Sequence, residues 1–181
     1  MVSSTHAQIT TAPVIVPTPT PRTPLTAPEN PELKRATQLV RRGEAETALP
    51  IIEKYLEAHP GDLQGRFLRG IALTDLKRAE DAIQVFTGIT SEYPELPEPY
   101  NNLAVLYAAE GRLEAARRAL EQSVAANPSG VVAQENLGDL YLRLAAAAYG
   151  KVVALDPKSR APRAKLRLLE EIINPPAPTK P

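Results

Sequence analysis

Small and large apolar residues recur in the middle of this chain with a period of about 34 residues. Three kinds of position keep this period: small residues, large apolar residues, and a proline that closes each repeat. The small residues are Ala36, Gly70 and Ala104, then Ala48, Ala82 and Ala116; the large ones are Leu39, Leu73 and Tyr107, then Ile52, Phe86 and Leu120; the prolines are Pro60, Pro94 and Pro128. A fixed period of this length predicts a repeat architecture.

Each repeat predicts two amphipathic helices of about 14 residues with a short turn between them. Gly43 and Gly111 mark the turn, and Lys77 stands at the corresponding place of the second repeat. Glycine suits the left-handed backbone conformation that such turns use. Neither helix buries its apolar stripe alone, so the repeats must stack on one another. The pattern therefore predicts an all-α solenoid.

The fourth repeat is shorter than the others. From Val131 its pattern restarts in phase, with Leu137, Gly138 and Tyr141 in place. Pro157 nevertheless comes five residues earlier than the period from Pro128 requires, so five residues are missing near the turn. The remaining apolar or small positions recur at about 3.6 residues per step, namely Leu137, Tyr141, Leu144, Ala148, Val152 and Leu155. This is the period of one uninterrupted helix, which we expect over about 131–155.

A second interpretation of the fourth repeat stays open at this point. Ala145 and Tyr149 stand at second-helix positions when they are counted back from Pro157. These residues are compatible with two helices joined by a very tight turn at Leu144-Ala145.

Proline-rich segments flank the repeats. Seven prolines lie between Met1 and Pro31, and four more follow Asn174. Such compositions cannot bury a core, so we expect disordered tails at 1–30 and 174–181. Between them we expect one helical domain over 31–173, with repeats at about 31–60, 63–94, 97–128 and 131–157 and a charged amphipathic capping helix at 162–173.

Residues 98–128 resemble the tetratricopeptide-repeat (TPR) consensus. Its signature positions are occupied by Tyr100, Leu103, Ala104, Tyr107, Gly111, Ala116, Leu120, Val124 and Pro128. The earlier repeats depart from it at Arg69, at Arg35 and at Pro50. The resemblance is to proteins of bacterial type, and it implies a right-handed superhelical α-solenoid that binds a peptide or protein in a concave groove.

The resemblance also indicates which side chains line that groove. They belong to the first helices of the second, third and fourth repeats: Gln64, Phe67, Ile71, Thr74, Asn101, Asn102, Val105, Glu135 and Asp139. We expect Phe67, Ile71 and Val105 to form an apolar floor, with the two asparagines binding a peptide backbone. The alternative that these side chains only pack neighbouring helices stays open. Asn102 stands at a place typical of a carboxylate clamp, but Leu68, Ile71 and Asp75 occupy the places of its cations in the second repeat, so we do not expect a cationic clamp.

The composition offers little for catalysis. There is no cysteine, and the two histidines are His6 in the N-terminal tail and His59, which we expect to cap a helix end. No metal-binding, nucleophile or phosphate-loop motif occurs in the sequence, so we expect neither enzyme activity nor a cofactor. Because 21 Lys and Arg residues balance 21 Asp and Glu residues, we do not expect a nucleic-acid partner.

No apolar run is long enough to span a bilayer, so we expect no membrane insertion. We expect a cytoplasmic protein as the chain stands, or an exported one if a signal sequence upstream of Met1 was removed. The leading hypothesis is a scaffold or adaptor of undetermined oligomeric state. The alternative, suggested by the Pro/Thr-rich tail, is an accessory subunit that tethers an enzyme in a cell-envelope or secretion pathway.

Overall fold

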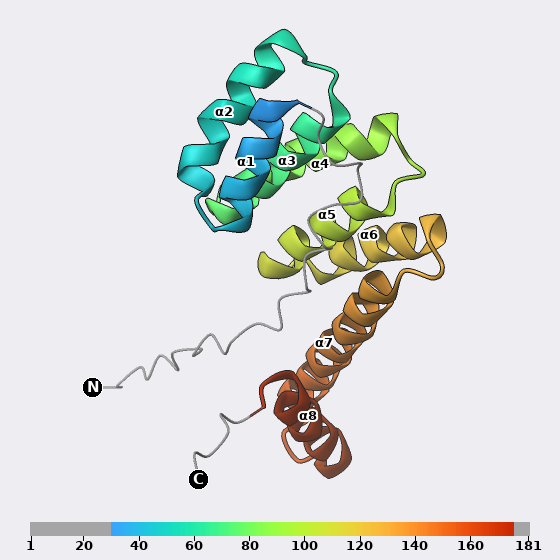
Figure 1. Ribbon diagram of the computed structural model, residues 1–181. Coiled ribbons are helices and arrows are strands. Elements are labelled where there is room, and N and C mark those ends of the chain that lie inside the picture. Colours follow the sequence, from blue (N-terminus) through green and yellow to red (C-terminus); the bar gives the residue numbers. More distant parts are fainter. Residues whose placement is uncertain (1–29, 176–181) are drawn as a thin grey trace, which may run out of the picture. The chain divides into compact units, whose positions relative to one another are not determined.

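The computed structural model describes residues 30–175, and within this range it contains eight α-helices and no strand. The helices are α1 (Pro31–Arg41), α2 (Ala45–Ala58), α3 (Leu63–Asp75), α4 (Ala79–Glu92), α5 (Pro97–Ala109), α6 (Leu113–Ala126), α7 (Val131–Leu155) and α8 (Arg160–Ile173) (Figure 1). The two expected tails fall outside the described residues except at their inner ends.

The described residues form two compact units, which are considered separately. The N-terminal unit ends at Leu140 and holds α1 to α6 with the first ten residues of α7. The C-terminal unit, residues 141–175, holds the rest of α7 and α8.

Close packing of small against large residues joins the two helices of a repeat. At Gly70 on α3, an added Cβ would lie 2.6 Å from Cζ of Phe86 on α4. The corresponding residues of the neighbouring repeats, Ala36 and Ala104, are 0% exposed. Because the first helix carries no bulk at this point, the second helix can approach until its large side chain is fully buried.

The turns between the paired helices have the backbone conformation that the sequence predicts. Gly43 and Gly111 have φ angles of 78° and 73°, and Lys77 adopts 61° at the corresponding place. Glycine reaches this left-handed region without strain, whereas the Cβ of Lys77 makes the same conformation more costly. The repeat geometry therefore overrides the preference of Lys77.

Helix starts are fixed by side chains and prolines. The Asn30 side chain accepts a hydrogen bond from the backbone N–H of Glu32 at 2.8 Å, and Asp62 accepts one from Gly65 at 2.6 Å. Pro31 and Pro97 begin α1 and α5. A proline at the first helical position loses no hydrogen bond, so these features set where the first helices begin.

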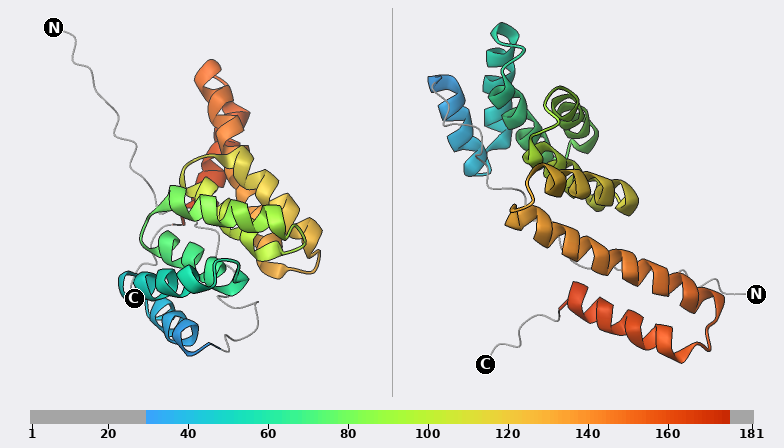
Figure 2. Two further views of the ribbon diagram at one scale, coloured as in Figure 1. Left: turned by 90° about the horizontal axis from the view of Figure 1, so that it is seen from above. Right: turned by 90° about the vertical axis from the view of Figure 1, so that its right-hand side faces the viewer.

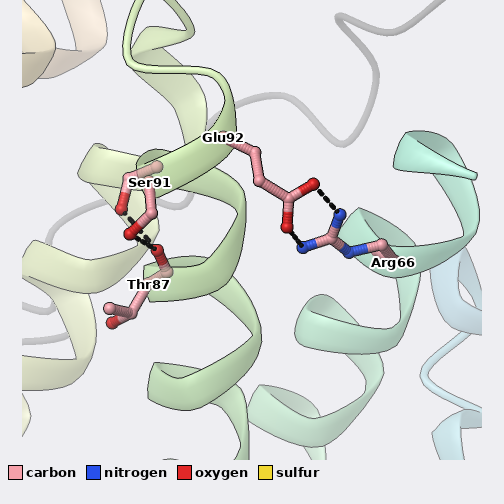
Figure 3. Close-up of polar contacts among 5 residues, drawn as sticks. Arg66, Thr87, Ser91 and Glu92 are labelled. Carbon is pink, nitrogen blue, oxygen red and sulfur yellow. Dashed lines mark hydrogen bonds and ion pairs between the residues drawn. The ribbon is translucent and has the colours of Figure 1, made fainter. Parts of the chain in front are cut away.

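An ion pair joins the start of α3 to the end of α4 (Figure 3). Arg66 donates from Nη1 and Nη2 to the two carboxylate oxygens of Glu92, at 2.6 and 2.7 Å. These hydrogen bonds hold the pKa of the Glu92 carboxyl below its usual value. Because Glu92 is exposed, the pair is screened by solvent and its contribution to stability is small.

This pKa shift has a predictable consequence for pH dependence. The folded-state pKa of Glu92 is lowered, so the stabilisation is present above the ordinary glutamate pKa and is lost as pH falls through the folded value. We therefore expect Glu92→Gln to reduce stability slightly at neutral pH and not at all in acid. Urea unfolding of both proteins over a pH series measures this difference. A difference that does not change with pH would contradict the prediction, and Glu95→Gln serves as the exposed control.

Helix α7 runs unbroken from Val131 to Leu155, as its periodicity predicts. Its buried residues, Ala133, Asn136 and Leu140, all lie in the N-terminal unit. In the C-terminal unit α8 runs back beside the second half of α7 (Figure 2), and Nζ of Lys165 lies 5.3 Å from the centre of the Tyr149 ring. No residue of α8 is buried, so this helix pair leaves much apolar surface exposed.

Candidate functional site

The residues predicted for the groove lie on the first helices of their repeats. Gln64, Phe67, Ile71 and Thr74 share one face of α3, because they are spaced by three, four and three residues. Asn101, Asn102 and Val105 lie on α5, and Glu135 and Asp139 lie on α7. All nine belong to the N-terminal unit.

The apolar members of this set are part of the core. Phe67, Ile71 and Val105 are 5%, 8% and 7% exposed. The ring of Phe67 packs edge-on against Phe86, with ring centres 5.6 Å apart and an angle of 67° between the planes. These side chains hold the helices together and offer a partner little surface, which matches the packing alternative left open by the sequence.

The two asparagines are engaged within the protein. Asn101 is fully buried, and its Oδ1 accepts a hydrogen bond from Nδ2 of Asn136 at 2.7 Å. Asn102 donates from Nδ2 to the backbone oxygen of Glu98 at 2.9 Å. Asn101 therefore connects α5 to α7. Asn136 was not predicted from the sequence, although it stands one full period after Asn102 and takes its place in the next repeat.

The accessible members of the set are polar. Gln64, Thr74 and Asp139 are half-buried and Glu135 is exposed. Thr74 donates its hydroxyl to the backbone oxygen of Gly70 at 2.9 Å. Glu98, at the place of Gln64 in the third repeat, is also half-buried. The part of the predicted groove that a partner can reach is therefore made of polar and acidic side chains.

The zero net charge of the sequence conceals two oppositely charged parts. Residues 30–140 contain 12 Lys and Arg residues and 17 Asp and Glu residues, a formal charge of −5. Residues 141–175 contain 7 Lys and Arg residues and 3 Asp and Glu residues, a formal charge of +4. The N-terminal unit, which carries the predicted groove, is therefore acidic. A count over the whole chain could not show this.

Two shallow crevices flank Arg69 on the N-terminal unit, away from the predicted set. One, of about 250 Å³, is lined by α3 and α4 and includes Arg66 and Asp81. The other, of about 380 Å³, lies between α2 and Arg69, whose Nε is 3.6 Å from Oε1 of Glu53. Two arginines and one aspartate line the first crevice, and one arginine and two glutamates line the second, so both present surfaces of mixed charge.

The described part of the chain contains no cluster of three or more His, Asp or Glu residues that could hold a metal ion. Nδ1 of His59 lies 3.1 Å from the backbone oxygen of Tyr55, and its ring stacks on the Tyr55 ring. This is the helix-end role expected from the sequence; His6 lies outside the described residues. Between residues 30 and 175, no helix has the length and apolar character needed to cross a membrane.

Comparisons with known proteins identify the repeats. Two family models, both described as tetratricopeptide repeat, match residues 33–97 and 73–137. No curated protein matches the sequence.

Solved structures with the same arrangement of helices share little sequence with this chain. The first TPR domain of the human RPAP3 protein has a TM-score of 0.59 at 18% identity, covering 63% of this chain and 90% of that domain. TTC0263 of Thermus thermophilus has a TM-score of 0.58 at 21% identity, covering 77% of this chain and 79% of that chain. MamA from Desulfovibrio magneticus has a TM-score of 0.59 at 20% identity, covering 78% of this chain and 75% of that chain. These similarities confirm the predicted fold class.

Proposed function

Because this chain belongs to the tetratricopeptide-repeat family, whose repeats are protein-interaction modules, we propose that it is a non-enzymatic scaffold that binds a basic peptide segment along the first helices of its repeats. The family supports the general role in protein binding. The surface and the chemistry of the partner are inferred from the residues below.

The observation that carries this proposal is the charge of the accessible first-helix surface in the third and fourth repeats. Helix α5 and residues 131–140 carry three carboxylates, Glu98, Glu135 and Asp139, and no lysine or arginine. None of the three forms an ion pair with another described residue. A lysine or arginine of a partner would therefore meet carboxylates that no cation of the described residues already neutralises.

The buried residues give this surface a fixed shape. Phe67 and Val105 sit in the core, and the Asn101–Asn136 hydrogen bond holds α5 against α7. A rigid helix face holds the backbone of its carboxylate residues in place, so binding requires no ordering of the backbone, which favours affinity. Gln64 and Thr74 extend the same kind of surface along α3 with uncharged polar groups. We infer that the partner segment is extended, hydrophilic and basic.

Charge reversal tests the proposal. We expect the double variant Glu135→Lys with Asp139→Lys to weaken binding of a basic peptide at least about tenfold, since each substitution replaces attraction by repulsion. Peptides selected from a random displayed library on the wild-type chain provide the probe, and fluorescence anisotropy measures their affinity. The selected peptides are expected to be rich in lysine and arginine, and their affinity is expected to fall as salt is added.

The matched control carries the same change of charge on a second helix. Glu46→Lys with Glu57→Lys changes two exposed carboxylates of α2, and this variant should bind the peptide nearly as well as the wild type. Circular dichroism checks that both variants remain helical. The proposal fails if no basic peptides are selected, or if both variants lose affinity equally.

A further inference from the structure

One stripe of α7 repeats every seven residues and is exposed along the whole helix. It contains two residues of each heptad, and its eight positions are Val131, Gln134, Gly138, Tyr141, Ala145, Ala148, Val152 and Leu155. Seven of them are exposed and Ala145 is half-buried. None is charged, and Val131 and Leu155 are 76% and 87% exposed. Apart from Gln134 the eight residues are small or apolar, and such residues at this spacing are typical of a helix that pairs with another helix.

The complete repeats show what normally covers this stripe. In the second repeat the large side chain of Phe86, eight residues before the closing Pro94, fills the space beside Gly70. Gly138 occupies the place of Gly70 two periods later, and a Cβ added there would meet nothing within 4 Å. The residue eight positions before Pro157 is Tyr149. The fourth repeat therefore contains both partners of this contact, but the contact is not made.

The missing turn explains why the contact is not made within one chain. Gly138 and Tyr149 lie eleven residues apart on one continuous helix, a distance of about 16 Å along its axis. The five residues that would form the turn between the paired helices are missing from this repeat. When a turn is too short to let a chain fold back, a second copy can supply the same element.

We propose that two copies of this chain associate through antiparallel α7 helices, so that residues 145–155 of each copy occupy the second-helix position in the fourth repeat of the other. Tyr149 of one copy then packs over Gly138 of its partner. The arrangement is symmetric, so the contact forms twice. This interface goes beyond the proposed peptide-binding function and does not depend on it.

A second contact of the complete repeats supports the same arrangement. In the third repeat the hydroxyl of Ser123 donates to the backbone oxygen of Pro97 at 2.8 Å, so these positions lie together. The corresponding residues of the fourth repeat are Val152, five residues before Pro157, and Val131, one full period after Pro97. In the proposed dimer these two exposed valines meet across the interface, which removes apolar surface from water.

The residues of the stripe are also compatible with pairing of identical helices. Because none of the eight carries a charge, two copies meet without repulsion between like charges. Gly138, Ala145 and Ala148 lie near its middle, where small side chains allow two helices to approach closely. A partner of different sequence would not explain why the exposed positions match the contacts made inside the complete repeats.

The first test is the mass of the protein in solution at physiological salt. Sedimentation equilibrium of the wild-type chain at micromolar concentration should give twice the chain mass of 19.6 kDa. Gly138→Glu introduces a carboxylate into the stripe at an open position, so it should weaken the dimer at least about tenfold and leave the helix content intact. Gly150→Glu is the matched control, because Gly150 lies on α7 outside the stripe and is equally open.

Three results of this experiment would overturn the proposal. These are a monomeric wild type, a Gly138→Glu variant that remains as dimeric as the wild type, and a Gly150→Glu variant that dissociates as readily as Gly138→Glu. In the first case the stripe is either uncovered or bound by an unrelated partner. In the third case the effect is a general response of the helix to a new charge.

Disulfide crosslinking then distinguishes two copies from one folded-back chain. The sequence contains no cysteine, so Gly138→Cys with Tyr149→Cys introduces one defined pair. Oxidation should give a covalent dimer. Gly138→Cys with Lys151→Cys should crosslink much less, because two residues further along α7 the side chain points to the other side of the helix. A disulfide formed within one chain would show that the two-helix interpretation of the fourth repeat is correct, and it would overturn the proposal, as would the absence of crosslinking.

Discussion

Replacing Phe86 with alanine is expected to lower the free energy of unfolding by about 3–5 kcal/mol. Phe86 is 0% exposed, fills the space beside Gly70 and touches the ring of Phe67. Removing the ring leaves a cavity where Gly70 of α3 packs against α4, and the surrounding helices cannot fully collapse into it. Urea unfolding followed by circular dichroism measures the change. Thr87→Ala, at the exposed neighbouring position, should change stability by less than about 0.5 kcal/mol.

A double-mutant cycle with Gly70 tests the cause of this loss. In an exposed helix Gly→Ala stabilises by up to about 1 kcal/mol. At Gly70 the added Cβ would lie 2.6 Å from the Phe86 ring, so we expect Gly70→Ala to destabilise the wild type. The cost should be smaller when Phe86 is already leucine, because the shorter side chain leaves room. Strictly additive effects would show that close contact does not determine the stability of this helix pair.

Asn136→Ala is expected to lower the free energy of unfolding by about 2 kcal/mol. The substitution leaves Oδ1 of Asn101 without its hydrogen bond in a fully buried place. Because the pair joins α5 to α7, amide hydrogen exchange should become faster in residues 131–140 while α1 and α2 stay protected. Chemical unfolding and hydrogen exchange with mass spectrometry measure the two effects.

The double variant Asn101→Leu with Asn136→Leu distinguishes a polar cost from a packing cost. Nδ2 of Asn101 is buried and makes no hydrogen bond within the described residues, so the wild-type pair already includes an unsatisfied donor. Replacing both partners by apolar groups of similar size should therefore recover most of the stability that a single substitution removes. The loss in free energy of unfolding of the double variant is compared with the summed losses of the two single leucine variants. If the two are equal, the asparagines contribute through shape alone.

The constant spacing of the repeats predicted the packing positions well, because every complete repeat places them in the same environment. Ile52, Phe86 and Leu120 recur at one position of the pattern, and all three are 0% exposed. The same reasoning could not separate core from groove on the first helices. Phe67 lies on the apolar stripe of α3 whether it faces a partner or the second helix, and only the packing of its ring against Phe86 separates the two roles.

The polar part of the candidate site was partly predictable. Glu135 and Asp139 were expected on the first-helix surface and are accessible there, while their role in binding stays a prediction. The partner of Asn101 was not predicted, because a hydrogen bond between side chains 35 residues apart depends on how two repeats are offset. The long helix α7 was predicted, since five missing residues leave no room for a turn.

The division of charge between residues 30–140 and residues 141–175 affects how the protein behaves in dilute buffer. A molecule with a net charge of zero and opposite charges on separate parts of its chain resembles a large zwitterion. Its copies can attract one another by simple coulombic forces, and such molecules dissolve better as salt is added, because ions screen that attraction. Low ionic strength therefore favours loose, non-stoichiometric clustering of this protein, whereas an association driven by apolar helix faces persists in salt.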